Sequence, residues 1–273
     1  MLNLFFKKDM TIITGFIETN SRGNFKDYLN YAEQFTLQIP NNMIIFVEKH
    51  NIQSILNVRK KYSFEKLTHI IPIELNELKL YKYLNDIKML YELKKEKVNV
   101  KSYLPEYLLV VNSKFEFFEK SLLLNPFKTY NFMWIDFGIS KRGYNNIDML
   151  KIKNIIKSPK PNVSYAIITS NFNCDDCKDG FIWVAAGGLI TLNNTLNSIE
   201  FLKIWENVFI KCLNENIYIL EEYILFYIYK YNLVNLDIFY ANYDTLVLKY
   251  HGDHLNINAK KKREIVLKNN EPS

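Results

Sequence analysis

The sequence predicts an α/β fold: one domain with a central, mostly parallel mixed sheet flanked by helices. Short runs with the composition of buried strands alternate with helical patterns from residue 10 onward. Strand, helix and strand at this spacing favour right-handed βαβ units and therefore parallel strands. The 273 residues suffice for one large core, and they contain neither an internal repeat nor a convincing linker. One domain over residues 1–255 is expected, followed by a polar basic tail over 256–273.

The first half of the chain supplies three strand–helix units. In residues 24–35 the apolar positions Phe25, Tyr28, Leu29, Ala32 and Phe35 recur with a helical period. The expected strands cover residues 10–17, 42–48 and 68–73, and the expected helices cover 24–35, 51–62 and 74–96.

The second half alternates in the same way after the break at Pro105. A helix over 108–124 is expected to lead into a strand over 130–137. The later expected helices cover 146–156, 196–212 and 218–231. The later expected strands cover 163–169, 181–192, 236–241 and 245–250.

Composition and charge argue against a disordered, a nucleic-acid-binding and a membrane-spanning protein. Hydrophobic residues are 48% and charged residues 23%, which is typical of a folded globular chain. The net charge of +6 favours anionic partners. The densest run of basic residues, 260–263, lies in the polar tail, so nucleic-acid binding is not expected. No window approaches the ~20 apolar residues that span a bilayer, and no signal peptide is evident, so a cytoplasmic protein is expected, with peripheral membrane contact left open.

The three cysteines do not form a secreted disulfide framework. Cys174 and Cys177 make one C-x-x-C pair, but no second pair or nearby histidine completes the four ligands of a structural zinc site. A loop with incidental thiols is the favoured interpretation, and a reducible loop disulfide is the alternative.

Asp136 closes the apolar run from Tyr130 to Ile135 and precedes Phe137 and Gly138. At the end of a buried strand its carboxylate would face a cleft, where Mg²⁺ or Mn²⁺ takes one or two carboxylates and completes its shell with water and phosphate oxygens. The structural alternative is an Asp-x-Gly turn that ends the strand. The motif alone favours the turn.

Other candidate residues each have a structural alternative. His251 and His254 lie in "HGDH" and suit Mn²⁺ or Zn²⁺, or they belong to a polar loop. Gly187 and Gly188 mark a bulge, a close approach of a ligand or a packing bend. Glu221 and Glu222 begin a helix, where acids are stabilised by the helix dipole, or one of them faces the cleft as a base. Arg59 and Lys114 are cations that either meet phosphate or lie on the solvated surface.

Four segments in this order resemble the HtrL/YibB family: "TIITGFIET", "NSKFEFFEKSLLLNPFKTYNFMWIDFGIS", "AAGGLITL" and "HGD". The resemblance extends from about residue 11 to about residue 254, and "NPF…WIDFGI" is its most specific part. It implies a GT-A-like (Rossmann-like) glycosyltransferase domain, in which a nucleotide-sugar lies at the strand ends and a D-x-D motif holds the metal. Asp136 matches the first acid of that motif. Gly138 stands in place of the second acid, which puts metal dependence in doubt.

The resemblance also implies roles for the other candidates. It implies a Mn²⁺ or Mg²⁺ ion bound by Asp136 and His251, with His254 as the alternative histidine ligand. Thr14, Gly15 and Phe16 would lie along the nucleoside, Arg59 and Lys114 would meet the diphosphate, and Gly187 and Gly188 would leave room for the sugar. Glu221 or Glu222 would contact the donor sugar or the acceptor.

The function expected on this basis is transfer of a sugar from a nucleoside diphosphate sugar, with UDP-sugar favoured, to a hydroxyl of a glycan, a lipid-linked sugar or a protein. Two alternatives remain open. One is a GT-A-like module that has lost catalysis and serves in nucleotide binding or assembly. The other is a sugar-phosphate nucleotidyltransferase, which ranks lower because the segment after the first strand lacks a glycine-rich phosphate loop.

Overall fold

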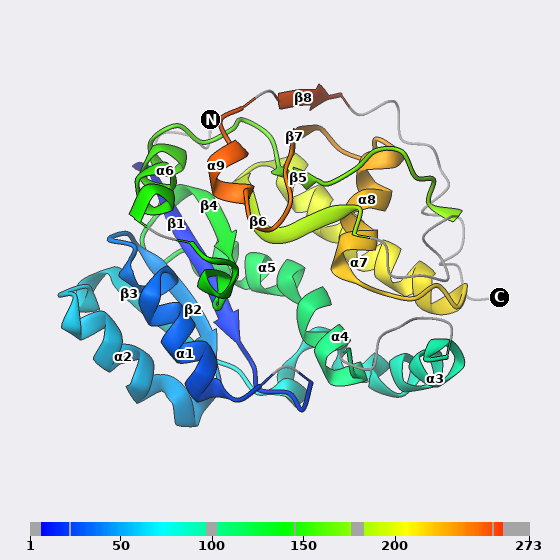
Figure 1. Cartoon of the computed structure of the whole chain (residues 1–273), viewed down its shortest axis with the longest axis horizontal. Helices are drawn as coiled ribbons and strands as arrows, with labels where there is room; N and C mark the ends of the chain where they lie inside the picture. Colours follow the sequence, from blue (N-terminus) through cyan, green and yellow to red (C-terminus); the bar gives the residue numbers. More distant parts are fainter. Residues whose placement is uncertain are drawn as a thin grey trace.

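Eight strands form one sheet in the order β3-β2-β1-β4-β6-β5-β7-β8 in the computed structural model of the protein (Figure 1). The structure describes residues 7–21, 23–96, 103–144, 146–175, 183–252 and 254–258. The strands are β1 (Lys7–Phe16), β2 (Met43–Val47), β3 (Thr68–Pro72), β4 (Thr129–Ile135), β5 (Ser164–Ile167), β6 (Ala185–Asn193), β7 (Leu236–Tyr240) and β8 (His254–Ile257).

The pairing of the strands confirms the predicted mixed, mostly parallel sheet. β1 pairs in parallel with β2 and with β4, and β2 with β3. β5 and β7 are also parallel. β6 runs antiparallel between β4 and β5, and β8 is antiparallel to β7 at the edge.

Helices cover both faces of the sheet. One face packs against α1, α2, α6 and α9, and the other against α3, α4, α5, α7 and α8. In Figure 1, α1 and α2 lie beside the blue N-terminal strands, and α7 and α8 lie in the yellow C-terminal half. The helices are α1 (Phe25–Gln34), α2 (Ile52–Lys61), α3 (Leu84–Lys94), α4 (Pro105–Asn112), α5 (Lys114–Leu124), α6 (Asn146–Lys157), α7 (Leu196–Asn214), α8 (Glu221–Lys230) and α9 (Leu246–Lys249). None of the helices in the described ranges has the length and apolar character needed to cross a membrane.

Three expected elements differ in the structure. The predicted helix over 74–96 consists of two 3₁₀ segments followed by α3, and a capping box between Glu74 and Glu77 begins the first segment. The predicted helix over 108–124 is divided at Ser113 into α4 and α5, because the Ser113 hydroxyl bonds back to the Leu109 carbonyl.

The predicted strand over 245–250 is wrong. Its apolar run is too short for periodicity to distinguish strand from helix, and it forms α9, which buries the adjacent residues Leu246 and Val247. The strand at this edge is instead β8, which pairs with β7 and continues past residue 255, the expected end of the domain.

The order of the strands places a crevice between β1 and β4. From β1 the chain moves outward through β2 to β3, then returns to the other side of β1 as β4. In open α/β sheets, ligands bind at the carboxyl ends of the strands at such a reversal. Here these ends carry Gly15 and Phe16 on β1, and Asp136 and Phe137 just after β4.

Candidate functional site

A pocket of about 560 Å³ opens at this crevice. Strand β1, helices α1, α4, α5 and α8, and the turn after β4 all contribute to its wall. Its charged lining residues are Asp136, Glu221, Glu222, Lys114, Lys141 and Arg142, and its aromatic ones are Phe16, Tyr28, Tyr103, Tyr107, Phe117, Trp134, Phe137, Trp183 and Tyr243. The pocket therefore combines acids, cations and flat rings at the position where α/β sheets bind ligands.

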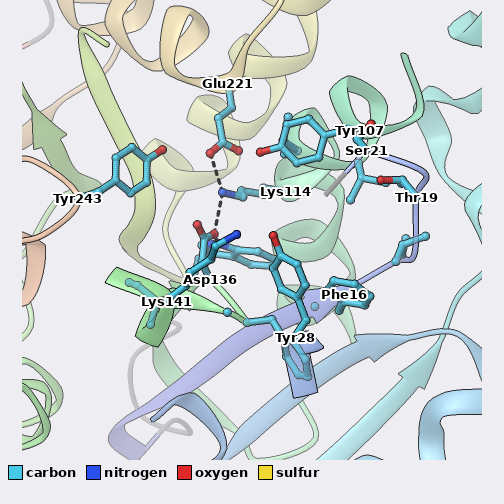
Figure 2. Close-up of a pocket in the computed structure, with 18 of the residues that line it drawn as sticks. Phe16, Thr19, Ser21, Tyr28, Tyr107, Lys114, Asp136, Lys141, Glu221 and Tyr243 are labelled. Carbon is cyan, nitrogen blue, oxygen red and sulfur yellow. Dashed lines mark hydrogen bonds and ion pairs between the residues drawn. The ribbon is translucent and has the colours of Figure 1, made fainter. Parts of the chain in front are cut away.

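The Lys114 ammonium lies at the centre of the pocket wall. Its Nζ donates to Asp136 Oδ1 at 2.9 Å, to Glu221 Oε1 at 2.7 Å and to the Gly187 carbonyl at 3.1 Å. Figure 2 shows the lysine between the two carboxylates. Burial opposes the charge on Lys114, but the carboxylates of Asp136 and Glu221 outweigh it and hold the pKa of Lys114 above its ordinary value.

Asp136 faces α5 because of the period of two along β4. Phe132 and Trp134 point to the α5 face, so Asp136, two residues farther on, points there as well. Its Oδ1 accepts from the Trp134 indole at 2.7 Å in addition to Lys114, and its backbone N–H donates to the Gly188 carbonyl. The carboxylate is one-third exposed and lines the pocket, so the strand-end position predicted from sequence is confirmed.

Glu221 and Glu222 begin α8 and both line the pocket. Glu221 is buried, and its Oε2 has no hydrogen-bond partner among the described residues. Burial raises the pKa of Glu221 to about 8, although the Lys114 ammonium counteracts this shift. Glu221 therefore gives up its proton at a higher pH than an ordinary glutamate does.

Glu222 has different partners. Its Oε1 accepts from the Tyr243 hydroxyl at 2.7 Å, and its Oε2 has no hydrogen-bond partner in the described part of the chain. Burial, reinforced by the nearby carboxylates, raises the pKa of Tyr243 well above its ordinary value. Tyr243 thus remains a donor and orients Glu222.

Aromatic rings form the wall at the end of β1. The rings of Phe16 and Tyr28 lie with centroids 4.8 Å apart, and Phe137 lies 5.7 Å from Phe16. Gly15 and Phe16 both line the pocket, and their contact with a nucleoside stays a prediction. Thr14 does not, because its side chain is fully buried within the sheet; its predicted contact with a nucleoside is corrected.

Two exposed cations on the turn after β4 were not singled out from the sequence. Lys141 lies over the rings of Tyr28 and Tyr31, and Arg142 over Trp183 and Tyr243. Neither cation forms an ion pair with a residue in the described ranges. The sequence did contain a signal for them: they are adjacent cations, five and six positions after Asp136, in the segment that follows the carboxyl end of a predicted strand.

The prediction that Arg59 meets a diphosphate is wrong. Its side chain is fully buried near the amino ends of β2 and β3, away from the pocket. It donates to the carbonyls of Leu37, Ile39 and Asn41 and to the Thr68 hydroxyl. Arg59 therefore ties together the segment that precedes β2 and the start of β3.

Gly187 and Gly188 give space to protein carboxylates and do not line the pocket, which corrects their predicted role toward the sugar. A Cβ on Gly187 would lie 2.5 Å from Glu221 Oε1, and one on Gly188 would lie 3.3 Å from Asp136 Oδ2. The register between β5 and β6 also shifts at this point, which confirms a bulge.

The histidines do not complete a metal site at Asp136. His251 is exposed beyond α9 and does not line the pocket. His254 belongs to β8, which β6, β5 and β7 separate from β4, so its strand lies roughly 19 Å away across the sheet. Gly138 supplies no ligand, and Asp136 Oδ1 already accepts from Lys114 and Trp134. The residues present do not fit the expected ion, and both histidine assignments are corrected.

Among the described residues, one other group of possible metal ligands occurs, formed by Glu18, Glu48 and His50 at the ends of β1 and β2. The Glu18 backbone N–H donates to Glu48 Oε2 at 3.1 Å. None of the three side chains lines the pocket. In the cysteine loop, Cys174 is buried and Cys177 lies outside the described residues, as does the basic run 260–263.

Comparison with known proteins identifies a family and one solved structure of low similarity. Residues 8–236 match the family described as "Bacterial protein of unknown function (HtrL_YibB)". The solved structure of 4-diphosphocytidyl-2C-methyl-D-erythritol synthase from Anaerococcus prevotii DSM 20548 is similar with a TM-score of 0.44 and 11% identity, over 96% of this chain and 94% of that one. No curated protein matches the chain.

Proposed function

The chain belongs to the HtrL_YibB family, and we propose that it is a glycosyltransferase that binds a nucleoside diphosphate sugar, with UDP-sugar favoured, and moves the sugar to an acceptor hydroxyl. One observation carries the proposal. At the point where the strand order reverses between β1 and β4, a single pocket holds two cations without an ion pair in the described chain, a wall of aromatic rings, and three carboxylates. This is the combination of groups that a charged, flat and polyhydroxylated ligand requires.

The cations Lys141 and Arg142 are suited to the diphosphate. Both are exposed, both line the pocket, and both lie within the turn that follows Asp136. A departing nucleoside diphosphate gains negative charge as the bond to the sugar breaks, and fixed cations stabilise that charge. Arginine can also bind two phosphate oxygens at once.

The rings of Phe16 and Tyr28 are suited to the nucleobase. They lie together at the carboxyl end of β1, across the pocket from Glu221 (Figure 2). Stacking of a base on aromatic side chains contributes about 1–3 kcal/mol per base and tolerates different bases. The carboxylates Glu221 and Glu222 are left at the other end, where sugar hydroxyls need acceptors.

Glu222 is the proposed general base. In the transfer, the anomeric carbon–oxygen bond breaks and its electron pair leaves with the diphosphate, while the acceptor oxygen forms the new bond to that carbon. The acceptor hydroxyl must give up its proton, and Glu222 Oε2 is a carboxylate oxygen with no hydrogen-bond partner in the described chain, on a side chain oriented by Tyr243. Glu221 suits this role less because its side chain is 4% exposed and its Oε1 accepts from Lys114.

Binding is tested first. Thermal shift and calorimetry with UDP, GDP, CDP and their sugar conjugates should raise the midpoint of unfolding for at least one nucleotide, because a ligand of the folded state stabilises it by mass action. Absence of binding by every nucleotide would refute the proposal. Binding without turnover would favour the non-catalytic alternative. Release of pyrophosphate from a nucleoside triphosphate supplied with a sugar phosphate, with no nucleoside diphosphate released from the sugar conjugates, would favour the nucleotidyltransferase.

Catalysis is tested with Glu222→Gln. Loss of a positioned general base should lower the turnover number by about 10²–10⁴-fold with little change in nucleotide affinity. Glu206→Gln is the matched control, because Glu206 lies on α7, pairs with Lys79 and does not line the pocket. Turnover that is equal in both variants would remove Glu222 from the mechanism.

A further inference from the structure

Three oxygen ligands converge on one point of the pocket wall, and the Lys114 ammonium occupies that point. The oxygens are Asp136 Oδ1, Glu221 Oε1 and the Gly187 carbonyl, at 2.9, 2.7 and 3.1 Å from Nζ. Carboxylate and carbonyl oxygens are the ligands that hard divalent cations take. An ammonium has three N–H donors, and here each has an acceptor, so Nζ retains none for a phosphate.

The ammonium is fixed in this place. The Lys114 side chain is 5% exposed and its Nζ lies 5.3 Å from the centroid of the Trp134 ring. Its departure would leave Glu221 Oε1, on a side chain that is 4% exposed, without its donor, and Asp136 without its compensating charge. A divalent ion could reach these oxygens only by displacing a buried cation that two carboxylates hold.

The glycine beneath the ammonium supports the same conclusion. A Cβ at position 187 would lie 2.5 Å from Glu221 Oε1, so only glycine lets that carboxylate approach β6 closely enough for Nζ to bond to it and to the Gly187 carbonyl together. Strand β6, the first turn of α8 and Lys114 therefore fit together closely around the Lys114 ammonium.

We propose that Lys114 replaces the divalent cation of this site, so that a nucleoside diphosphate binds without metal while Lys141 and Arg142 meet its phosphates. The identity of the ligand rests on the proposed function; the replacement of the metal does not. Lys114 is a positioning residue, because it holds Asp136 and Glu221 and has no donor left for the ligand.

Binding of Mn²⁺ alone tests the inference without any nucleotide. Electron paramagnetic resonance titration is performed on the His50→Ala protein, which disables the separate group of Glu18, Glu48 and His50. Adding Asp136→Asn to this protein should leave Mn²⁺ binding unchanged. A Mn²⁺ site that is present with His50→Ala and disappears with Asp136→Asn would overturn the inference.

Removal of the ammonium supplies the converse test. Lys114→Ala in the His50→Ala protein frees the three oxygens and should create a Mn²⁺ site that Asp136→Asn abolishes. A folded Lys114→Ala protein that binds no Mn²⁺ would contradict the view that these oxygens form a cation site. If Lys114→Ala does not fold, the titration of the His50→Ala protein with and without Asp136→Asn still tests the inference, because both of those proteins retain Lys114.

Nucleotide affinity distinguishes this inference from the proposed function. The wild-type dissociation constant for the best-binding nucleoside diphosphate should agree within about twofold between EDTA and excess Mn²⁺. Tightening by about tenfold or more with Mn²⁺, lost again in EDTA, would overturn the inference while leaving the proposed function intact. If no nucleotide binds in either condition, the proposed function fails, and the Mn²⁺ titrations alone decide the role of Lys114.

Discussion

The ring of Tyr28 fills the space that any side chain at position 138 would need. A Cβ on Gly138 would lie 2.6 Å from Cδ1 and 2.8 Å from Cε1 of that ring. In the D-x-D motif expected of a GT-A enzyme, the second acid would stand at this position. The structure gives a physical reason for glycine at position 138: the Tyr28 ring occupies the space that a longer side chain would need.

Gly138→Ala should therefore displace the Tyr28 ring. Overpacking of a fitted contact typically costs about 1–3 kcal/mol of folding free energy, which denaturant titration measures. Because Tyr28 lines the pocket beside Phe16, nucleotide affinity should fall as well. Tyr28→Ala provides the control: in that background Gly138→Ala should cost little, since the opposing ring is absent. An equal cost in both backgrounds would show that the ring is not the obstacle.

Lys141→Ala and Arg142→Ala should each weaken binding of a nucleoside diphosphate. A hydrogen bond to a charged group contributes about 1.5–3 kcal/mol, so calorimetry should record losses of about 10- to 100-fold. Lys60→Ala is the matched control, because Lys60 is an exposed cation on α2 that does not line the pocket. Should the control weaken binding as much as the two variants, the effect would be one of net charge alone.

Much of the sheet could be predicted from sequence because its signals are local. Short apolar runs between helical patterns identified β1, β2, β3 and β4, and the end of the last run placed Asp136 at the rim of the sheet. The carboxylates at the start of α8 could also be predicted as candidates, since two adjacent acids before an apolar helix are visible in the sequence.

The partners of these residues could not be predicted, because long-range packing decides them. Lys114 and Asp136 are 22 residues apart, and Lys114 and Glu221 are 107 apart, and no local pattern indicates that they meet. Arg59 and Lys114 have the same sequence-level appearance, a cation on a helix. One lies near the amino ends of the strands and the other at the carboxyl ends, so only the topology separates a structural residue from a site residue.

Arg59→Met should destabilise the protein without affecting the pocket. The substitution removes the donors for three carbonyls, those of Leu37, Ile39 and Asn41, and each buried acceptor left without a partner costs about 1–3 kcal/mol. The denaturation midpoint should fall strongly, whereas the nucleotide dissociation constant, measured on folded protein at low temperature, should not change. A selective loss of nucleotide affinity at unchanged stability would restore Arg59 as a phosphate ligand.

The pKa of Glu221 links the stability of the fold to pH. Burial raises it from the ordinary value of 4.5 to about 8 in the folded protein. Between these two pH values the folded state holds a proton that the unfolded state has released. The free energy of unfolding therefore falls as pH rises toward the pKa of Glu221 in the folded protein. Lys114 does not reverse this trend, because its raised pKa keeps it protonated throughout the window.

Urea titrations at pH values between 5 and 8 should therefore show stability decreasing with pH, at a rate on the order of 1 kcal/mol per pH unit once other titrating groups are subtracted. Glu221→Gln should flatten this dependence, because glutamine does not titrate while its amide oxygen can still accept from Lys114. Glu206→Gln, on α7 and outside the pocket, should leave the slope unchanged. A slope that survives Glu221→Gln would mean that another group takes up the proton, and Glu221 would then be ionised beside Lys114 at neutral pH.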